Sequence, residues 1–493
     1  MNKRNTVAAA ILGFGILSCT SDLHKDPIGL LTPEQISTEP TANSVTLSVT
    51  SSYQMLASTL NLLNEWRWDL GTVFRDDFVV DDIASDDVKK KWNPDGDQAW
   101  MDQVSSFNFT ASNQAFNGQW TYDYEGISRA NLAISYLTDA AIVTKIGMAP
   151  ATRDKLLGQA YFLRAFYYFD LVNNFGDVPL LLKPLKSFSD AYAVAHRETK
   201  ANVYAQIGTD LAQAKTLLPS VKAVDGEKWR ASKGAVLAMQ AKVALYQEKW
   251  TEVISTVTEL QGLNFYSLNP NYFDNFDVSK EATETEVIFE YDHQSGKSPR
   301  NGNGLCAPLD WGFIAPTDNF LAEFEPNDPR QAYTVNVTDK AVYKLLGSTD
   351  TRYKGNDDAP SNKIYIRFAD VLLWKAEAYN ETGAYANAIA LINQIRARAR
   401  TGVAVNGSVP PAGTLADRPA SVDKAQIKGW LMHERRVELG FESQRFNDLK
   451  RWKIAKQVLT ALGKNFQDFN YVYPIPQGEI DKSGGSITQN AGY

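Results

Sequence analysis

Two segments of the chain combine aromatic rings with planar polar side chains, the mixture that a saccharide site needs. An aromatic plane stacks on the apolar C–H face of a sugar ring, and carboxylate, amide and guanidinium groups make directed hydrogen bonds to paired hydroxyls. The first segment contains Arg75, Asp76, Asp77, Trp92, Asn93 and Trp100, and the second contains Asp310 and Trp311. With 11 Trp and 22 Tyr in 493 residues, the chain is rich in such rings. These segments are therefore the first candidates for ligand contact.

Any of these tryptophans could instead belong to the core, because tryptophan is highly buried on average. Trp92 is flanked by charged and polar residues with no helical or strand period, which favours a loop position. Trp120 and Trp374 lie in helical patterns and are assigned to the core. The sequence leaves the roles of Trp66 and Trp68 open.

The sequence lacks the common catalytic and metal-binding motifs. Its four histidines, His24, His196, His293 and His433, have no metal-ligand spacing. Glycoside hydrolases work through two carboxyl groups about 5–10 Å apart, so a hydrolase stays open as an alternative, although no such pair stands out. We expect no catalytic residue and no cofactor.

Six aspartates gather in a short stretch of the chain: Asp76, Asp77, Asp81, Asp82, Asp86 and Asp87. Calcium prefers such oxygen ligands, but the stretch lacks the spacing and glycine of an EF-hand loop. A solvated acidic loop, or one that pairs with Lys89 to Lys91, is favoured over calcium. We therefore expect no metal.

The first residues have the pattern of a secretory signal. Two basic residues precede an apolar run over residues 6–17, and a Leu-Ser pair stands directly before Cys19. The run is too short to span a bilayer, which takes roughly 20 residues. The pattern resembles a bacterial lipobox, which predicts a signal peptide over 1–18, acylation of Cys19 and a tether over 19–43. An ordinary signal peptide with an incidental cysteine is the alternative.

Acylation would attach the protein to a membrane. Acyl chains gain about 0.8 kcal/mol per buried methylene, so two or three chains anchor firmly. The acidic tether after Cys19 also resembles an export signal for the cell surface, with a plain flexible linker as the alternative. The sequence thus predicts a lipid-anchored protein that faces outward.

The composition excludes some classes of partner and cross-link. The net charge of −7 and the pI near 5.4 disfavour binding to nucleic acid. The only cysteines are Cys19 and Cys306, so acylation of the first leaves no internal disulfide.

Helical periodicity dominates the chain. We expect helices over 44–63, continuing through Trp66, and over 120–137, 155–173, 204–218, 232–247, 250–260, 366–381, 384–400, 424–439 and 443–459. A β-like run covers 286–291, and charged, Pro- and Gly-punctuated segments are expected to be loops.

The helices form closely spaced pairs with small residues at the crossing points, which is typical of tetratricopeptide-like repeats. We predict a mostly α fold: a tetratricopeptide-like helix-pair scaffold that supports an irregular, loop-rich ligand lobe with minor β-structure. Within a domain over 44–493, the scaffold is assigned to 44–70, 120–262, 366–400 and 424–460. The lobe is assigned to 71–119, 263–365 and 401–423.

Four passages, together with the lipobox, resemble the SusD/RagB family of surface glycan-binding lipoproteins. They are residues 158–180, which end in Asn-Phe-Gly-Asp-Val-Pro-Leu; 366–398; 434–452, which contain Glu-Arg-Arg-Val-Glu-Leu; and 473–493, which begin Tyr-Pro-Ile-Pro. They occur in family order over nearly the whole chain, which makes the resemblance specific.

The resemblance implies a non-enzymatic protein of the outer membrane with about four tetratricopeptide units. Such proteins capture a nutrient, most often an oligosaccharide, and deliver it to a SusC/RagA-like TonB-dependent transporter. A surface glycoside hydrolase, or a repeat scaffold that binds only protein, are the alternatives.

The charged residues of the family motifs are expected to be structural. Arg164, Glu377, Glu434, Arg435 and Arg445 fall on predicted helices. Because unpaired buried charges are costly, these side chains should pair with opposite charges.

The resemblance also implies where a ligand binds. In the family, contacts commonly come from an aromatic in an early loop and from another before a Pro-Thr-x-x-Phe helix start, which here begins at Pro316. Trp92 and Trp311 are accordingly the expected stacking platforms, with Asp77 and Asn93 as hydroxyl partners. Asp76, Trp100 and Arg352 are weaker candidates.

Overall fold

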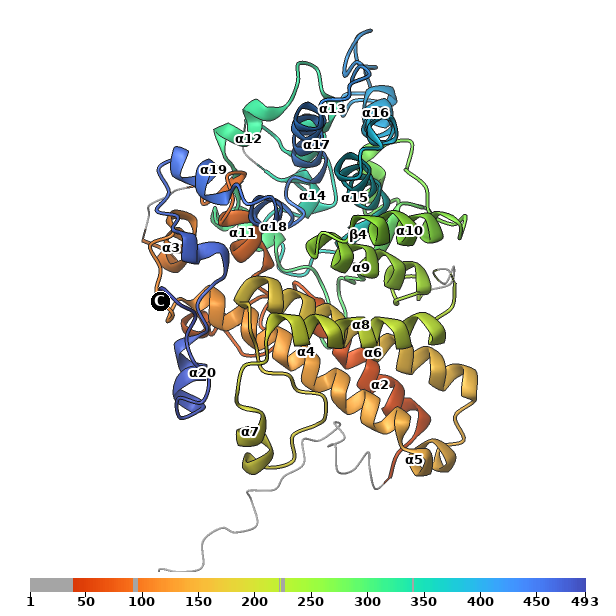
Figure 1. Ribbon diagram of the computed structural model, residues 1–493, viewed down its shortest axis with the longest axis vertical. Helices are drawn as coiled ribbons and strands as arrows, with labels where there is room; N and C mark the ends of the chain where they lie inside the picture. Colours follow the sequence, from red (N-terminus) through yellow and green to blue (C-terminus); the bar gives the residue numbers. More distant parts are fainter. Residues whose placement is uncertain (1–38, 92–95, 221, 223–226, 339–340) are drawn as a thin grey trace, which may run out of the picture.

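The computed structural model describes residues 39–91, 96–220, 222, 227–338 and 341–493, and α-helices dominate these ranges (Figure 1). The longest helices are α4 (Gln114–Thr138), α6 (Pro150–Phe175) and α8 (Lys200–Leu217). In the described part of the chain, β-structure is limited to two sheets of two strands each. The predicted mostly α fold with minor β-structure is confirmed.

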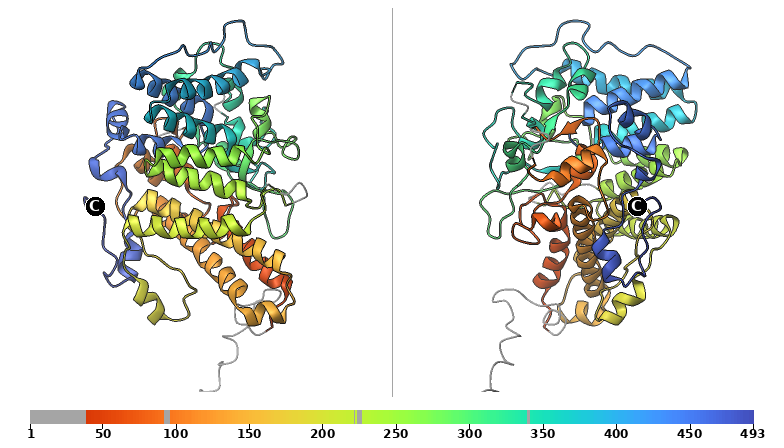
Figure 2. Two further views of the ribbon diagram at one scale, coloured as in Figure 1. Left: turned by 45° about the vertical axis from the view of Figure 1, so that its right-hand side comes forward. Right: turned by 90° about the vertical axis from the view of Figure 1, so that its left-hand side faces the viewer.

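Neighbouring helices pack as pairs that stack along the long axis of the molecule (Figures 1 and 2). Helix α6 packs on α8. In the same way α9 (Lys233–Tyr246) packs on α10 (Trp250–Gln261), and α15 (Phe368–Glu381) packs on α16 (Tyr385–Thr401). The turn between α15 and α16 is tight because Gly383 adopts a left-handed φ of 83°. This stack is the predicted tetratricopeptide-like scaffold.

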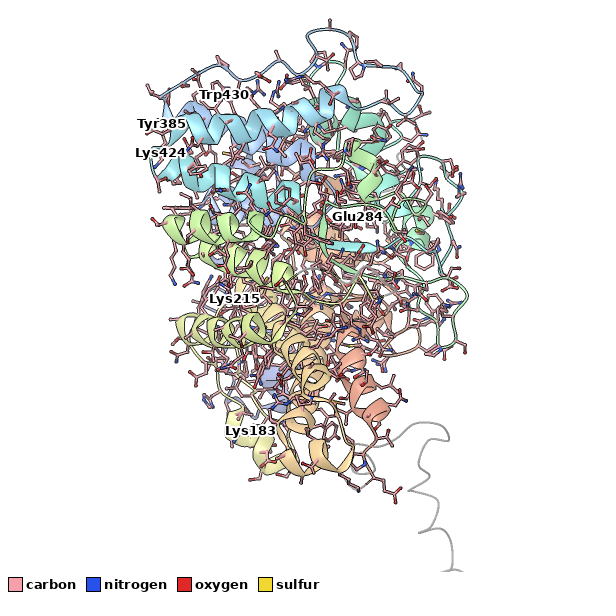
Figure 3. The ribbon with its side chains drawn as sticks, turned by 90° about the vertical axis from the view of Figure 1, so that its right-hand side faces the viewer. Lys183, Lys215, Glu284, Tyr385, Lys424 and Trp430 are labelled. Carbon is pink, nitrogen blue, oxygen red and sulfur yellow. The ribbon has the colours of Figure 1, made fainter. Side chains whose placement is uncertain are left out.

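Two further helices extend the scaffold. α2 (Ala42–Tyr53) packs on α4 and α6, and α17 (Lys424–Leu439) packs on α15 and α16. Figure 3 shows Tyr385 and Lys424 near each other toward one end of the molecule, with Lys215 of α8 lower along the same side. None of the helices in the described ranges is long and apolar enough to cross a membrane.

The second part of the molecule is made of short elements joined by long connections. Its helices are α11 (Cys306–Trp311), α12 (Asp318–Glu323), α13 (Pro329–Thr334) and α14 (Tyr343–Leu346). Its antiparallel strand pairs are β1 (Val88–Lys89) with β3 (Ala315–Pro316), and β2 (Val287–Tyr291) with β4 (Lys363–Arg367). The β1–β3 pair joins two candidate ligand segments that are far apart in the sequence.

The remaining elements are short helices. They are η1 (Gln54–Leu56), η2 (Trp68–Leu70), the π-helical η3 (Phe78–Ile83), α3 (Ala99–Ser106), α5 (Ala140–Lys145), α7 (Phe188–Val194), η4 (Tyr272–Asn275), α18 (Arg445–Arg451), α19 (Ala455–Ala461), η5 (Asp468–Tyr471) and α20 (Gln477–Lys482).

Three predicted segments are corrected. The first helix ends at η1, since Ala57 is extended and Asn61 has a φ of 60°. The helix predicted over 443–459 is divided into α18 and α19, because Lys453 adopts a φ of 60° between them. The segment 71–119 is not a set of long loops, since it contains η3, α3 and the start of α4 and is largely buried.

A buried ion cluster joins the scaffold to the second part. Glu438 of α17 accepts hydrogen bonds from Arg367 at 2.7 Å, from Arg330 at 3.0 Å and from Arg398. All four side chains are at most 4% exposed. Burial alone would raise the pKa of Glu438, but the three guanidinium groups hold it well below its ordinary value. We call this set, together with Glu286, the Glu438 cluster.

The charged motif residues are structural, as predicted. Arg164 pairs with Asp210, Glu377 with Arg451, Glu434 with Arg330, Arg435 with Asp370, and Arg445 with Asp86, at distances of 2.6–2.8 Å. Each motif side chain is at most 11% exposed, so the pairs lie inside the molecule.

Candidate ligand-binding site

Three tryptophans meet at the surface. Trp66 and Trp311 are 46% and 36% exposed, and Trp68 is half-buried between them and the core. The ring centroids lie 6.4 Å apart for Trp66 and Trp68, 6.4 Å for Trp66 and Trp311, and 5.9 Å for Trp68 and Trp311. The planes of Trp66 and Trp68 are nearly parallel, and Trp311 is tilted by 51° and 62° to them. We call this surface the tryptophan cluster.

Two buried phenylalanine rings pack against the inner side of the tryptophan cluster. Phe74 lies 5.6 Å from Trp68, and Phe313 lies about 6 Å from both Trp68 and Trp311, in edge-to-face geometry. Both phenylalanines are at most 2% exposed. Edge-to-face contacts are favourable for aromatic pairs, so the exposed rings rest on a fixed base.

Local backbone conformations turn the tryptophans outward. Trp66 has a left-handed φ of 48°, and its N–H donates to Asn61 Oδ1 at 2.9 Å. Trp311 is the last residue of α11, where Gly312 ends the helix with a φ of 80°. A left-handed φ at a large residue is costly, and here it places the ring of Trp66 at the surface.

Polar groups surround the cluster. The exposed side chains of Arg67 and Asp69 pair at 2.7 Å, and Asp310 beside Trp311 is exposed. The loop that contains Arg352 contacts the start of α11, where the N–H of Gly355 donates to the carbonyl of Cys306 at 2.9 Å. Planar polar groups beside stacked rings are the arrangement that a sugar requires.

The two predicted loops meet at this surface. The N–H of Lys91 donates to the carbonyl of Gly312 at 2.7 Å, directly after the β1–β3 pair. This contact places the segment that leads into Trp92 and Asn93 beside the turn of Trp311. Trp92 and Asn93 themselves lie outside the described residues, so their contact with a ligand stays a prediction.

Arg352 is exposed, with 63% of its side chain open to solvent, and pairs with Asp350. The side-chain hydrogen bond from Arg352 lowers the pKa of Asp350. An exposed guanidinium can exchange such a partner at little cost, so Arg352 stays a candidate.

Three of the predicted contacts, Asp76, Asp77 and Trp100, have side chains that are at most 6% exposed, and their contact with a ligand stays a prediction. Asp76 is fully buried, and Asp77 pairs with Arg75 at 2.7 Å and with Lys363. Trp100 is 5% exposed and donates to Gln98 at 2.7 Å. None of these three side chains belongs to the tryptophan cluster, and Asp77 lines a separate pocket.

The acidic stretch is also buried rather than solvated. Asp86 accepts from Arg445 at 2.8 Å, Asp87 accepts from Arg436 at 2.7 Å, and Asp82 accepts from Ser443. Among the described residues, no three acidic, His or Cys side chains are grouped so that they could hold a metal ion. Asp82, Asp86 and Asp87 thus face cations and polar groups from the C-terminal third of the chain.

The tryptophan cluster includes two residues whose roles the sequence left open. Trp66 was assigned to a continuing helix, and the signals that end this helix are the two asparagines in Asn61-Leu62-Leu63-Asn64 and the following Gly71. Trp66 and Trp68 are separated by one residue, which does not fit one helix face. Trp120 and Trp374, at 4% and 1% exposed, are in the core as predicted.

Two family models match most of the chain. Residues 325–493 match a model described as "SusD family", and residues 39–245 match one described as "Starch-binding associating with outer membrane". The chain belongs to the SusD family. Among its relatives, SusD-like protein P38 of Formosa agariphila is 28% identical over 512 residues, which is 94% of each chain.

Solved structures share this SusD fold. Surface glycan-binding protein A from Bacteroides fluxus matches with a TM-score of 0.74 at 24% identity, over 92% of this chain and all of that chain. A structure titled "Laminarin binding SusD-like protein" matches with a TM-score of 0.73 at 25% identity, over the same shares. The helical scaffold and the attached lobe are therefore a known arrangement.

Proposed function

We propose that this SusD-family protein is a surface glycan-binding protein and that the tryptophan cluster binds the glycan. The observation that carries the proposal is the exposure of Trp66 and Trp311 on an otherwise packed aromatic base. Exposed indole planes at an angle match successive sugar rings, whose C–H faces stack on them. The family description and the laminarin-binding relative support the same ligand class.

The ligand is passed on without chemical change in this proposal. The chain captures an oligosaccharide and delivers it to a SusC/RagA-like TonB-dependent transporter in the outer membrane. Closure of the protein over the transporter would exclude water from the stacked rings, which strengthens polar contacts to hydroxyls.

Attachment to the outer membrane is assigned to acylation of Cys19. Residues 1–38 lie outside the described residues, so this assignment rests on the lipobox pattern. Labelling of cells with a fatty-acid precursor tests it: the wild-type protein should take up label and be accessible to external protease. A Cys19→Ala variant should lose both, and label in this variant would contradict the assignment.

Affinity electrophoresis against a panel of polysaccharides, including starch and laminarin, tests the binding function. We expect retardation by at least one neutral glycan, with the loss of retardation in Trp66→Ala and Trp311→Ala. Trp430 is a matched control, because it is half-buried and lies on α17 outside the cluster. Equal retardation of all three variants would refute the assigned site.

Release of reducing sugar from the same panel distinguishes a binder from a hydrolase. We expect no release during prolonged incubation with purified protein. Steady release that scales with protein concentration would favour the hydrolase instead.

A further inference from the structure

A cleft lies on the scaffold and has no residue in common with the tryptophan cluster. It has a volume of about 680 Å³ and is formed where α8, α10, α15, α17 and α18 approach one another. Pockets of about 300–1,000 Å³ are the size that binds small ligands. We call it the scaffold cleft.

The scaffold cleft carries uncompensated positive charge. Its three carboxylates are already engaged, since Glu248 pairs with Lys453, Glu377 with Arg451, and Glu381 with Lys424. Three more lysines line it, Lys200, Lys428 and Lys450, and the amine of Lys450 already donates to the carbonyl of Asn173 at 3.3 Å and to Asn174 Oδ1 at 3.4 Å. In the part of the chain that the structure describes, no carboxylate lies within ion-pair distance of these three amines. Burial, partly offset by distant carboxylates, lowers the pKa of Lys450 to about 8.

One buried pair offers hydrogen-bonding groups at the cleft. Glu377 Oε1 accepts from Arg451 Nη1 at 2.6 Å and from Trp452 Nε1 at 2.9 Å. Arg451 Nη2 and Glu377 Oε2 have no hydrogen-bond partner among the described residues, although both side chains are more than nine-tenths buried. Unsatisfied buried groups are costly, so this donor and this acceptor have capacity for one more hydrogen-bonding partner.

The type of ligand follows from these groups together. The amines attract an anion, while Glu377 Oε2 repels a bare anion and needs a hydroxyl or N–H donor. Half-buried Trp250, Tyr246 and Tyr471 add aromatic surface for stacking. A sugar that carries a carboxylate or a sulfate supplies the anion, the hydroxyl donors and the ring face at once.

We infer that the scaffold cleft binds an acidic saccharide, at a site separate from the neutral glycan of the proposed function. Arg451 and Glu377 hold its hydroxyls, and Lys200, Lys428 and Lys450 neutralise its anionic group. The inference goes beyond the proposed function, because it concerns different residues and a different charge class.

Calorimetric titration of the full mature domain with trigalacturonate, a sulfated carrageenan oligosaccharide and neutral maltotriose tests the inference. We expect at least one acidic saccharide to bind, with affinity that falls as salt rises. Which of the two binds distinguishes the carboxylate from the sulfate. Lys200→Gln with Lys428→Gln should weaken this binding about tenfold or more, and the variant should fold because Lys200 is exposed and Lys428 half-buried.

Two control variants test whether the loss of acidic-saccharide binding is specific to the scaffold cleft. Lys482→Gln changes a lysine whose side chain is 75% exposed and lies outside the cleft, and it should bind like wild type. Trp311→Ala should also leave acidic-saccharide binding unchanged, which separates a failure here from a failure of the proposed function. The inference is overturned if neither acidic saccharide binds, if the double variant binds as tightly as wild type, or if a short poly-glutamate peptide competes equally well.

Discussion

The Glu438 cluster and the tryptophan cluster are opposites in chemistry and in accessibility. The first holds charged side chains that are at most 4% exposed, and the second holds apolar rings of which two are at least 36% exposed. In most proteins charge lies outside and large apolar groups lie inside. The inversion shows which residues maintain the fold and which are available to a ligand.

The comparison teaches that the family motifs and the binding site are separate features. Glu434 and Arg435 belong to a motif that identifies the family, and both are buried and paired. Trp66 and Trp311 lie outside the motifs, on a loop and at a helix end. In this chain the residues that maintain the scaffold and the residues that are open to a ligand are therefore different sets.

The largest effect should come from the Glu438 cluster. Glu438→Ala leaves three buried arginines short of a counter-charge, so the free energy of unfolding should fall by about 3–5 kcal/mol. Chemical denaturation measures the loss. Asp468→Ala breaks an exposed pair with Lys456 and should cost less than about 1 kcal/mol. Equal losses would remove the contrast between buried and exposed charge.

A second effect should appear in the pH dependence of stability. Burial raises the pKa of Asp82 to about 7, so its contribution is full below about pH 4 and is lost as pH rises through 7. Asp82→Asn removes this titration and keeps an acceptor for Ser443. Between pH 4 and 8 the wild type should lose about 4 kcal/mol of stability relative to the variant, because the pKa of Asp82 lies about three units above its ordinary value. A difference independent of pH would contradict a buried, titrating Asp82.

Substitutions in the tryptophan cluster should mainly lower the affinity for glycan, in contrast to the loss of stability expected for Glu438→Ala. Trp66→Ala and Trp311→Ala should each weaken glycan binding by about 30-fold, because central aromatic contacts cost about 2 kcal/mol when truncated. The melting temperature should change less than for Glu438→Ala, since both rings lie at the surface with 46% and 36% of their area exposed. Parallel calorimetry and thermal unfolding measure the two responses. Unfolding without a specific loss of affinity would assign these rings to the core.

The sequence predicts the features that local patterns determine, and it does not predict those that depend on contacts between residues far apart in the chain. Local periodicity predicts the helix pairs and the strand over 286–291. The family pattern predicts Trp311 and the motif charges that form pairs. The burial of Asp76 and Asp77 does not follow from local patterns, because their segment is enclosed by elements such as β4, and Lys363 of that strand is far away in sequence. Trp66 was missed because a left-handed backbone at Asn61 and Trp66 ends the helical pattern.

The smallest effect should come from Arg352. Its exposed side chain pairs only with Asp350 among the described residues, so Arg352→Ala should leave stability unchanged and weaken glycan binding less than about fivefold. Arg153→Ala, which removes another exposed arginine, should have no effect on binding. A loss as large as that of Trp311→Ala would make Arg352 a principal contact.

Hydroxyl-radical footprinting, read by mass spectrometry, tests the central claim most directly. In the free protein, Trp66 and Trp311 should be oxidised, while buried Trp120 and Trp374 should stay unmodified. A saturating concentration of the preferred glycan should protect Trp66 and Trp311 and leave half-buried Trp430 as reactive as before. If the glycan binds and both cluster tryptophans remain fully reactive, the ligand lies elsewhere and the account is wrong.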